Sequence, residues 1–182
     1  MFPLILYSIA DTLEQDRKSL LNSENKQGAI YMSQQRPSFI KQISDITPFP
    51  YAQDNPPGGQ GQIIGLSRAT GGEKIGADIL IVEPKNVLSY FHWHTEREEF
   101  FYVLRGSCSV RVGKASYTLQ TGDAMTCKAQ MGEGHQFVND SDGPVWILAV
   151  DTQEDTDEVY RPELGTILRR SDGSIATIPK AD

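Results

Sequence analysis

The sequence predicts an all-β fold, an antiparallel sandwich or a small barrel, and three observations support this prediction. Short runs rich in β-branched and aromatic residues follow one another through the middle of the chain. Residues typical of turns, such as Gly, Asp, Asn and Pro, separate these runs at regular spacing. No convincing helical pattern lies between the runs, although a fold of alternating helices and parallel strands would require one.

The predicted strands follow one another with a turn or loop between them. A segment rich in Pro and Gly, 47–62, precedes them and is typical of a connecting or wrapping segment. Gly71 and Gly72, between the first two strands, indicate a hairpin, and 140–144 form the loop before the last strand. The predicted strands are 62–69, 74–82, 87–94, 99–105, 107–112, 116–119, 124–128, 134–139 and 145–151.

Residues 1–31 differ from the rest of the chain. We interpret them as a loosely attached arm or as an extension from an upstream start codon, because Met32 begins a segment that reads like an ordinary protein start. A secretory signal is not expected, since no Lys or Arg precedes the apolar stretch 2–10 and Asp11 and Glu14 follow it.

The C-terminal part begins with an acidic run that we expect to be a solvated surface segment. The run contains Glu154, Asp155, Asp157 and Glu158. From Tyr160 onwards, scattered Pro and Gly residues predict a segment that wraps the barrel or frays. The predicted organisation is an N-terminal arm and connecting segment at 1–61, a barrel at 62–152, and an acidic and wrapping segment at 153–182.

Composition excludes several classes of protein. The 182 residues are 38% hydrophobic, which is enough for a core, and 17 Lys and Arg against 24 Asp and Glu give a formal net charge of −7. This acidity argues against a nucleic-acid partner, and the lack of an apolar run of transmembrane length argues against a membrane span. Cys108 and Cys127 are too few for a disulfide scaffold, so we expect half-buried, reduced thiols in a cytoplasmic protein.

The three histidines of the chain and one glutamate indicate a metal site. His92 and His94 are one residue apart on a predicted strand, so their side chains point to the same face. Glu99 follows after a short loop, and His135 opens a later strand. Imidazoles and a carboxylate that converge from neighbouring strands suit a first-row divalent ion. The alternative is a charged loop that binds nothing, but unpaired imidazoles inside an apolar barrel would be costly.

The segment FHWHTEREEFFYVLRG, residues 91–106, resembles the first signature of the cupin superfamily. That signature has the form G, five residues, HxH, three or four residues, E, six residues, G. The residues that match it are His92, His94, Glu99 and Gly106. Asn86 stands at the first Gly, and because Asn tolerates positive φ, we expect the turn there to survive.

The segment GDAMTCKAQMGEGHQFVN, residues 122–139, is similar to the second cupin signature. That signature has the form G, five residues, PxG, two residues, H, three residues, N. The residues that match it are Gly122, Gly132, His135 and Asn139. The usual Pro is absent and the segment before His135 is two residues longer. Either Gln130 takes the place of the Pro, or Lys128 does and the loop before His135 is extended.

The resemblance covers residues 62–152 and implies a double-stranded β-helix, or jelly roll: a cupin barrel with N- and C-terminal arms. It implies one divalent first-row metal ion, Fe, Mn, Ni or Zn. The implied ligands are His92, His94, Glu99 and His135. Similar small cupins pair through edge strands and N-terminal arms, so a homodimer is expected.

The resemblance leaves three functions open, because one fold hosts many activities. The first is a metal-dependent, oxygenase-like enzyme that acts on a small oxygenated or aromatic metabolite. The second is a sugar or keto-acid isomerase, and the third is a non-catalytic small-molecule-binding or sensor protein. Strand alternation turns Tyr90 and Phe101 inward, which favours a planar or aromatic substrate. Tyr90 and Glu133 are the candidate catalytic residues.

Overall fold

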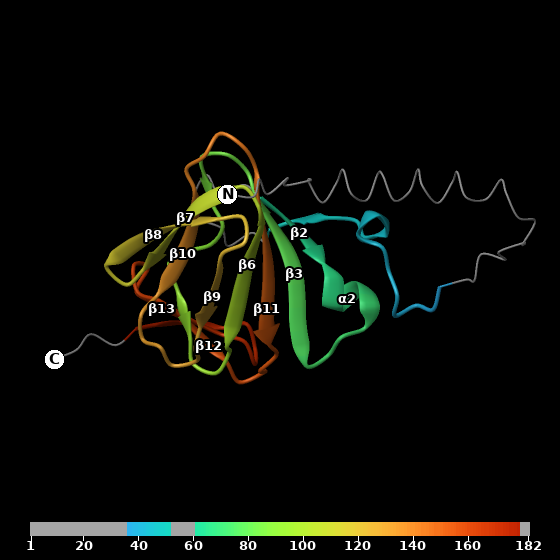
Figure 1. Ribbon diagram of the computed structural model, residues 1–182. Coiled ribbons are helices and arrows are strands. Elements are labelled where there is room, and N and C mark those ends of the chain that lie inside the picture. The colour runs from blue at the N-terminus through green and yellow to red at the C-terminus, as the bar shows by residue number, and fades with distance from the viewer. Residues whose placement is uncertain (1–35, 52–60, 179–182) are drawn as a thin grey trace, which may run out of the picture. The chain divides into compact units, whose positions relative to one another are not determined.

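Figure 1 presents the computed structural model, which describes residues 36–51 and 61–178. The expected arm or extension at 1–31 lies outside these described residues, as does 52–60 of the connecting segment. The described elements are η1 (Ile43–Asp45), β1 (Phe49–Pro50), β2 (Gly61–Gly65), α2 (Leu66–Thr70), β3 (Ile75–Val82), β4 (Asn86–Val87), β5 (Trp93–His94), β6 (Glu99–Arg105), β7 (Ser107–Val112), β8 (Ala115–Gln120), β9 (Ala124–Cys127), β10 (His135–Asn139), β11 (Val145–Thr152), β12 (Glu158–Arg161), β13 (Thr166–Arg169) and β14 (Ile175–Thr177).

Two antiparallel sheets form the barrel. One has six strands in the order β1-β2-β3-β11-β6-β9, and the other has four in the order β4-β10-β7-β8. Alternate side chains of both sheets enclose one apolar cluster, to which β6 contributes Phe101 and Val103 and β11 contributes Val145 and Ile147. All four of these side chains are buried. This arrangement confirms the predicted all-β jelly roll.

Most of the predicted strands are confirmed. β6 and β7 have the predicted bounds, Glu99–Arg105 and Ser107–Val112. The tight turn between them depends on Gly106, which has a φ of 89° that residues with a Cβ rarely adopt. The glycine of the first signature therefore has a conformational role.

The prediction of one strand over 62–69 is wrong in its second half. The chain leaves β2 at Gly65 and forms the short helix α2, which lies beside β3 in Figure 1 and ends at Gly71 with a φ of 83°. Leu66 packs from this helix against a second apolar cluster on the outer face of the six-stranded sheet. We infer that packing of the partly buried Leu66 against the sheet outweighs the strand-like pattern of the local sequence.

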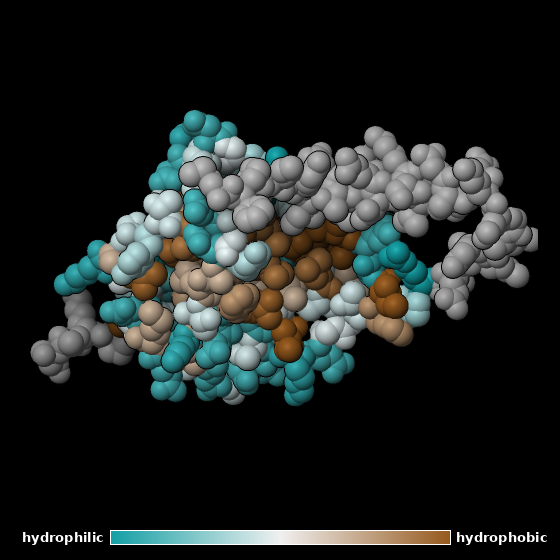
Figure 2. Space-filling view, viewed as in Figure 1, coloured by the Kyte–Doolittle hydropathy of each residue, from teal (hydrophilic) through white to brown (hydrophobic). Residues whose placement is uncertain are grey.

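The outer face of the six-stranded sheet thus carries apolar side chains of its own. Ile79 and Ile81 of β3 are buried there, and Leu104 and Trp146 pack against them. Figure 2 shows hydrophobic residues gathered where β3, β6 and β11 lie in Figure 1, with hydrophilic residues along the lower end. These inner and outer clusters explain why the second half of β3, residues 79–82, is apolar at every position.

The C-terminal segment needs a correction, because residues expected to wrap or fray form regular strands. β14, β13, β12 and β5 make a third antiparallel sheet in that order. Val159 of β12 lies opposite both Leu168 and His94, and Trp93 stacks on Tyr160 with ring centroids 4.2 Å apart. This sheet therefore attaches the C-terminal segment directly to the strand that carries His94.

Both cysteines are free and more deeply buried than expected. Burial, and then the charge of Asp140, raises the pKa of Cys108 to about 11. Burial, and then the charge of Glu99, raises the pKa of Cys127 to about 12. Both side chains are therefore neutral thiols at physiological pH. Among the described residues, no helix has the length and apolar character needed to cross a membrane.

Gly61→Ala is expected to lower the free energy of unfolding by about 1–3 kcal/mol. A Cβ at Gly61 would lie 2.6 Å from the backbone oxygen of Ile81, which cannot move aside without distorting the β2–β3 pairing. Gly143→Ala is the matched control, because nothing lies within 4 Å of a Cβ there. Urea unfolding measures both variants, and equal stability would contradict the prediction.

Candidate metal centre

Strand ends and one backbone bridge bring the predicted ligands together. His94 ends β5, Glu99 begins β6 and His135 begins β10. His92 lies just before β5 and exchanges two backbone hydrogen bonds with His135, of 3.2 and 2.8 Å. The prediction of one strand over 87–94 is wrong, because the chain bends between β4 and β5. His92 and His94 nevertheless line the same cavity.

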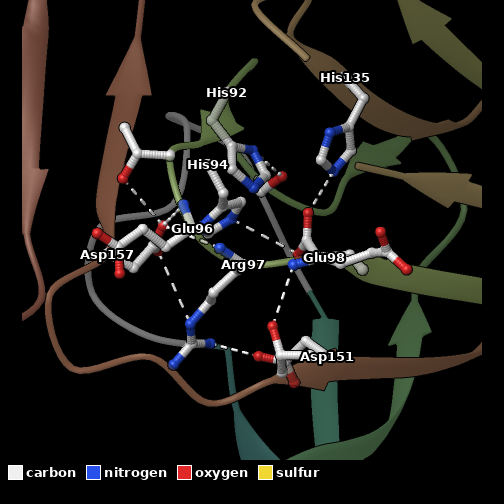
Figure 3. Close-up of polar contacts among 12 residues, drawn as sticks. His92, His94, Glu96, Arg97, Glu98, His135, Asp151 and Asp157 are labelled. Atoms are coloured by element: carbon white, nitrogen blue, oxygen red, sulfur yellow. Dashed lines mark hydrogen bonds and ion pairs between the residues drawn. The ribbon is translucent and has the colours of Figure 1, made fainter. Parts of the chain in front are cut away.

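The ligand atoms of these residues lie close together, and Figure 3 shows the rings of His92, His94 and His135 near one another. One ligand atom from each of His92, Glu99 and His135 lies within 4.8 Å of the other two. Nε2 of His94 is 3.6 Å from Oε1 of Glu99, and Nε2 of His135 is 3.3 Å from Oε2 of the same carboxylate. The four side chains therefore form one cluster, with Glu99 in contact with two of the histidines.

Hydrogen bonds determine which ring nitrogen of His92 and His94 carries the proton. Nδ1 of His92 is 2.8 Å from the carbonyl oxygen of Tyr90, and Nδ1 of His94 is 2.6 Å from Oδ2 of Asp157. Carbonyl and carboxylate oxygens accept hydrogen bonds, so Nδ1 is the donor in both rings. Nε2 of each neutral ring then keeps the lone pair that a metal ion would bind.

The electrostatics of the cluster favour the neutral form of two of its imidazoles, those of His92 and His135. Burial, and then the neighbouring histidines, lowers the pKa of His92 well below its ordinary value, and burial, and then His94, lowers the pKa of His135 to about 3. Burial raises the pKa of Glu99, and its Oε2 is buried with no hydrogen-bond partner among the described residues. Imidazoles around an oxygen without a hydrogen-bond partner form a donor set that fits a divalent first-row ion.

Asp157 shows that the expectation of a fully solvated acidic run is wrong. This carboxylate has no exposed surface, and it accepts hydrogen bonds from His94 and from the backbone amides of Glu96 and Arg97, at 3.0 and 3.3 Å. Burial acts to raise the pKa of Asp157, but the hydrogen bond and charge of His94, with the two amides, lower it to about 2. Asp157 therefore orients His94 and fixes the loop that leads to Glu99.

Asp157→Asn is expected to weaken Mn(II) binding about 10–100-fold, the usual cost of losing the outer hydrogen bond of a ligand histidine. The amide carries no charge, and one of its two polar atoms donates where the carboxylate accepts. Asp155→Asn is the matched control, because Asp155 is an exposed carboxylate of the same run. Titration of each variant followed by electron paramagnetic resonance of free Mn(II) measures the affinities, and equal values would contradict this role.

The cluster lines a cavity of about 430 Å³ to which the six-stranded sheet, β10, β12 and β13 contribute. Tyr90 and Phe101 line it, in agreement with the alternation argument. Glu133 does not line it: this side chain is exposed, and its carboxyl carbon is 3.4 Å from the position of a Cβ built at Gly113. The structure therefore brings Tyr90, but not Glu133, to the cavity.

The cavity also contains ionisable residues that the sequence did not single out, because none lies in a recognisable motif. They are Tyr51, Arg68, Asp78, Arg97, Asp151, Arg161 and Arg170. Burial, and then the charge of Asp151, raises the pKa of Asp78. Burial, and then the charge of Glu99, raises the pKa of Tyr51 to about 12.

Two turns differ from the expectations drawn from the cupin signatures. Gln130 has a φ of 57°, and its amide donates to the carbonyl of His94 at 2.9 Å. Proline can do neither, so Gln130 does not take the place of the missing Pro and the loop is extended instead. The expectation of positive φ at Asn86 is wrong, because Lys85 adopts it, with a φ of 61°. Asn86 begins β4, and its side chain donates to the carbonyl of Pro84 at 2.8 Å.

The fold and the cluster together define a small jelly-roll barrel with a cavity rich in histidine. The cupin domain family matches residues 79–151, a range that contains all four clustered side chains and Gly106 and that ends before β12. The chain therefore contains a cupin domain. No curated protein matches the chain in sequence.

Solved structures with the same fold support this assignment. A protein assigned as a sugar phosphate isomerase from Acidithiobacillus ferrooxidans aligns with a TM-score of 0.71 and 22% identity, over 76% of this chain and 90% of that chain. A sugar phosphate isomerase from Silicibacter pomeroyi aligns with a TM-score of 0.68 and 23% identity, over 76% and 92%. The polyketide cyclase RemF from Streptomyces resistomycificus aligns with a TM-score of 0.55 and 18% identity, over 79% and 87%. These similarities show the fold alone.

Proposed function

We propose that the protein is a metal-dependent enzyme that acts on a small oxygenated metabolite. The observation that carries this proposal is the convergence of ligand atoms from His92, Glu99 and His135 to within 4.8 Å, with His94 beside them. The cluster lines a cavity of about 430 Å³, a size that suits a small molecule.

In this proposal the four clustered side chains hold one divalent ion, which is Fe, Mn, Ni or Zn. Bound there, the ion would supply Lewis-acid activation of a carbonyl or hydroxyl oxygen. The chain contributes neutral imidazoles and a carboxylate, and it orients two of the imidazoles through the Tyr90 carbonyl and Asp157. Strands that cannot adjust independently keep this donor set in place before the ion binds.

Among the open functions, isomerisation of a sugar or keto acid has the most support. Asp78 lines the cavity with a raised pKa, which suits a group that takes up and returns a proton. The two structures assigned as sugar phosphate isomerases add support from the fold. The oxygenase-like reaction on an aromatic metabolite relied on Tyr90 and Phe101, but charged side chains and histidines outnumber aromatic ones in the lining.

Metal binding is tested first, with the full-length chain. Metal-free protein is titrated in turn with Mn(II), Fe(II) under anaerobic conditions, Ni(II) and Zn(II). We expect one ion per chain by native mass spectrometry and a higher unfolding temperature, because the ion binds the folded state alone. His94→Ala should lower both the metal content and the thermal gain. Failure of all four ions to bind would overturn the proposal.

The reaction class is tested next, with metal-loaded protein in D₂O. Aldoses, ketoses, their phosphates and 2-keto acids are incubated in turn, and NMR follows deuterium incorporation at the carbon next to the carbonyl. Incorporation together with isomer formation supports an isomerase. Oxygen consumption without isotope exchange would instead support the oxygenase-like reaction. Ligand-dependent stabilisation without any turnover would support a non-catalytic binding protein.

Three further expectations stay predictions: the homodimer, the cytoplasmic location, and the boundaries between arm, barrel and wrapping segment at 61/62 and 152/153. Sedimentation velocity of the full chain tests the first, and cell fractionation tests the second. Limited proteolysis with mass spectrometry tests the boundaries.

A further inference from the structure

The cavity beside the candidate metal centre contains four arginines, and the protein itself neutralises only part of their charge. Arg97 forms an ion pair with Asp151 and lies 3.7 Å from Asp157. The guanidinium of Arg68 lies over the ring of Phe49, 5.1 Å from its centroid. Arg97 is therefore already paired with carboxylates of the protein, whereas Arg68 packs on an aromatic ring and its charge opposes the rise in the pKa of Asp78 that burial causes.

The other two arginines, Arg161 and Arg170, have no carboxylate within 4.0 Å among the residues that the structure describes. Arg161 is half-buried and lies over the ring of Tyr90, 5.5 Å from its centroid. Arg170 is exposed to solvent and also lines the cavity. A cation in a cavity wall without a fixed counter-ion is available to an anionic ligand.

The β12–β13 hairpin brings both arginines to the same cavity. Arg161 ends β12 two positions after Val159, so strand alternation places these two side chains on one face. Arg170 directly follows β13, two positions after Leu168, which lies opposite Val159. All four residues line the cavity, so the hairpin and the residue after it contribute two apolar side chains and two cations to its wall.

Electrostatics agree that Arg161 faces the histidine cluster and that both cations face Tyr51. Burial and the other histidines are the main causes of the low pKa of His92, and the charge of Arg161 lowers it further. The charges of Arg170 and Arg161 also oppose the rise in the pKa of Tyr51, which burial and Glu99 cause. Both guanidinium groups and the carboxylate of Glu99 therefore act on one side chain of the lining.

We propose that Arg161 and Arg170 form an anion subsite, which binds a phosphate or carboxylate group of the substrate while its oxygenated end lies at the histidine cluster. Guanidinium groups bind both anions through paired, charge-assisted hydrogen bonds. The placement of the oxygenated end at the histidine cluster rests on the proposed function, whereas the binding of an anion by the two arginines does not. It narrows the substrate class to small anionic metabolites.

The experiment measures anion binding to the metal-free, full-length protein, so that its outcome does not depend on the ion. Inorganic phosphate and malonate are titrated separately and followed by isothermal titration calorimetry, with glucose as the neutral comparison. We expect at least one of the two anions to bind, and we expect glucose not to bind. Tighter binding of phosphate assigns a phosphate ester, and tighter binding of malonate assigns a carboxylate.

Arg161→Met and Arg170→Met remove the charge and keep most of the side-chain length. Each should weaken binding of the preferred anion about tenfold or more, as expected for loss of charged hydrogen bonds. Arg105→Met is the matched control, because Arg105 is exposed and does not line the cavity. Equal anion affinity in all three variants, or no anion binding by the unaltered protein, would overturn the subsite.

Mn(II) titration of the same variants separates this inference from the proposed function. Neither arginine belongs to the ligand cluster, so Mn(II) binding should persist in both variants. Loss of the positive charge of Arg161, which acts on His92, should not weaken it. Anion binding without Mn(II) binding would refute the metal centre and keep the subsite. Mn(II) binding without anion binding would do the reverse.

Discussion

Glu99→Gln is expected to lower the affinity of the full-length protein for Mn(II) by more than about 100-fold. This exceeds the usual effect of losing a hydrogen bond that a neighbouring residue makes to a metal ligand. Glu99 is the only carboxylate of the cluster, and its two oxygens lie 3.6 and 3.3 Å from Nε2 of His94 and His135. Gln keeps the shape of the side chain and removes its charge. The remaining imidazoles cannot offset the charge of a divalent ion.

The same variant separates loss of binding from loss of folding. Burial raises the pKa of Glu99, so the fold does not favour its charged form, and metal-free Glu99→Gln should unfold at a temperature no lower than the unaltered protein. At a free Mn(II) concentration about 100 times Kd, the unaltered protein should gain about 2.7 kcal/mol of unfolding free energy. The variant should gain almost none at that concentration.

Glu98→Gln is the matched control for this experiment. Glu98 precedes Glu99 in the chain but is exposed, and it does not line the cavity. Removing its charge should leave Mn(II) affinity within about twofold, because exposed charges are screened. Calorimetric titration of both variants gives the comparison. A Glu99→Gln protein that binds Mn(II) as tightly as Glu98→Gln would refute the assignment of the ligand cluster.

The sequence predicted most of the barrel and the residues that cluster inside it. Alternating patterns and turn residues placed β6 and β7 at their observed bounds. The same alternation put Phe101 inside, and the spacing of the cupin signatures singled out all the side chains of the cluster. These features depend on contacts that repeat every second residue or across one short loop, so a single sequence contains the information.

The features that escaped prediction depend on contacts between segments far apart in the chain. Asp157 contacts His94, 63 positions away, and nothing in an acidic run distinguishes a buried carboxylate from solvated ones. One sign was available: Asp157 directly precedes β12, two positions before the apolar Val159, and both side chains are buried. Arg161 and Arg170 escaped for a similar reason, because their common cavity exists only once the C-terminal hairpin covers it.

Phe137→Ala is expected to lower the free energy of unfolding by about 3–5 kcal/mol, the largest stability effect that a single truncation in this core should have. Phe137 is 1% exposed in the middle of β10, between the two sheets. Its ring packs against Phe101 with centroids 4.8 Å apart, and that neighbour packs in turn against the ring of His135, at 5.5 Å. Truncation therefore leaves a cavity behind a candidate ligand.

Tyr117→Ala is the matched control, because Tyr117 is an aromatic residue of the same four-stranded sheet that is 57% exposed. Its loss should change stability by no more than about 0.5 kcal/mol. Urea unfolding of the metal-free variants gives both values, and a cost below about 1 kcal/mol for Phe137→Ala would contradict the packing. Because His135 loses its support through Phe101, the same truncation should also weaken Mn(II) binding, whereas Tyr117→Ala should not. The stability of the core and the order of the candidate metal centre should thus depend on the same ring, since rigid packing holds a ligand side chain in place.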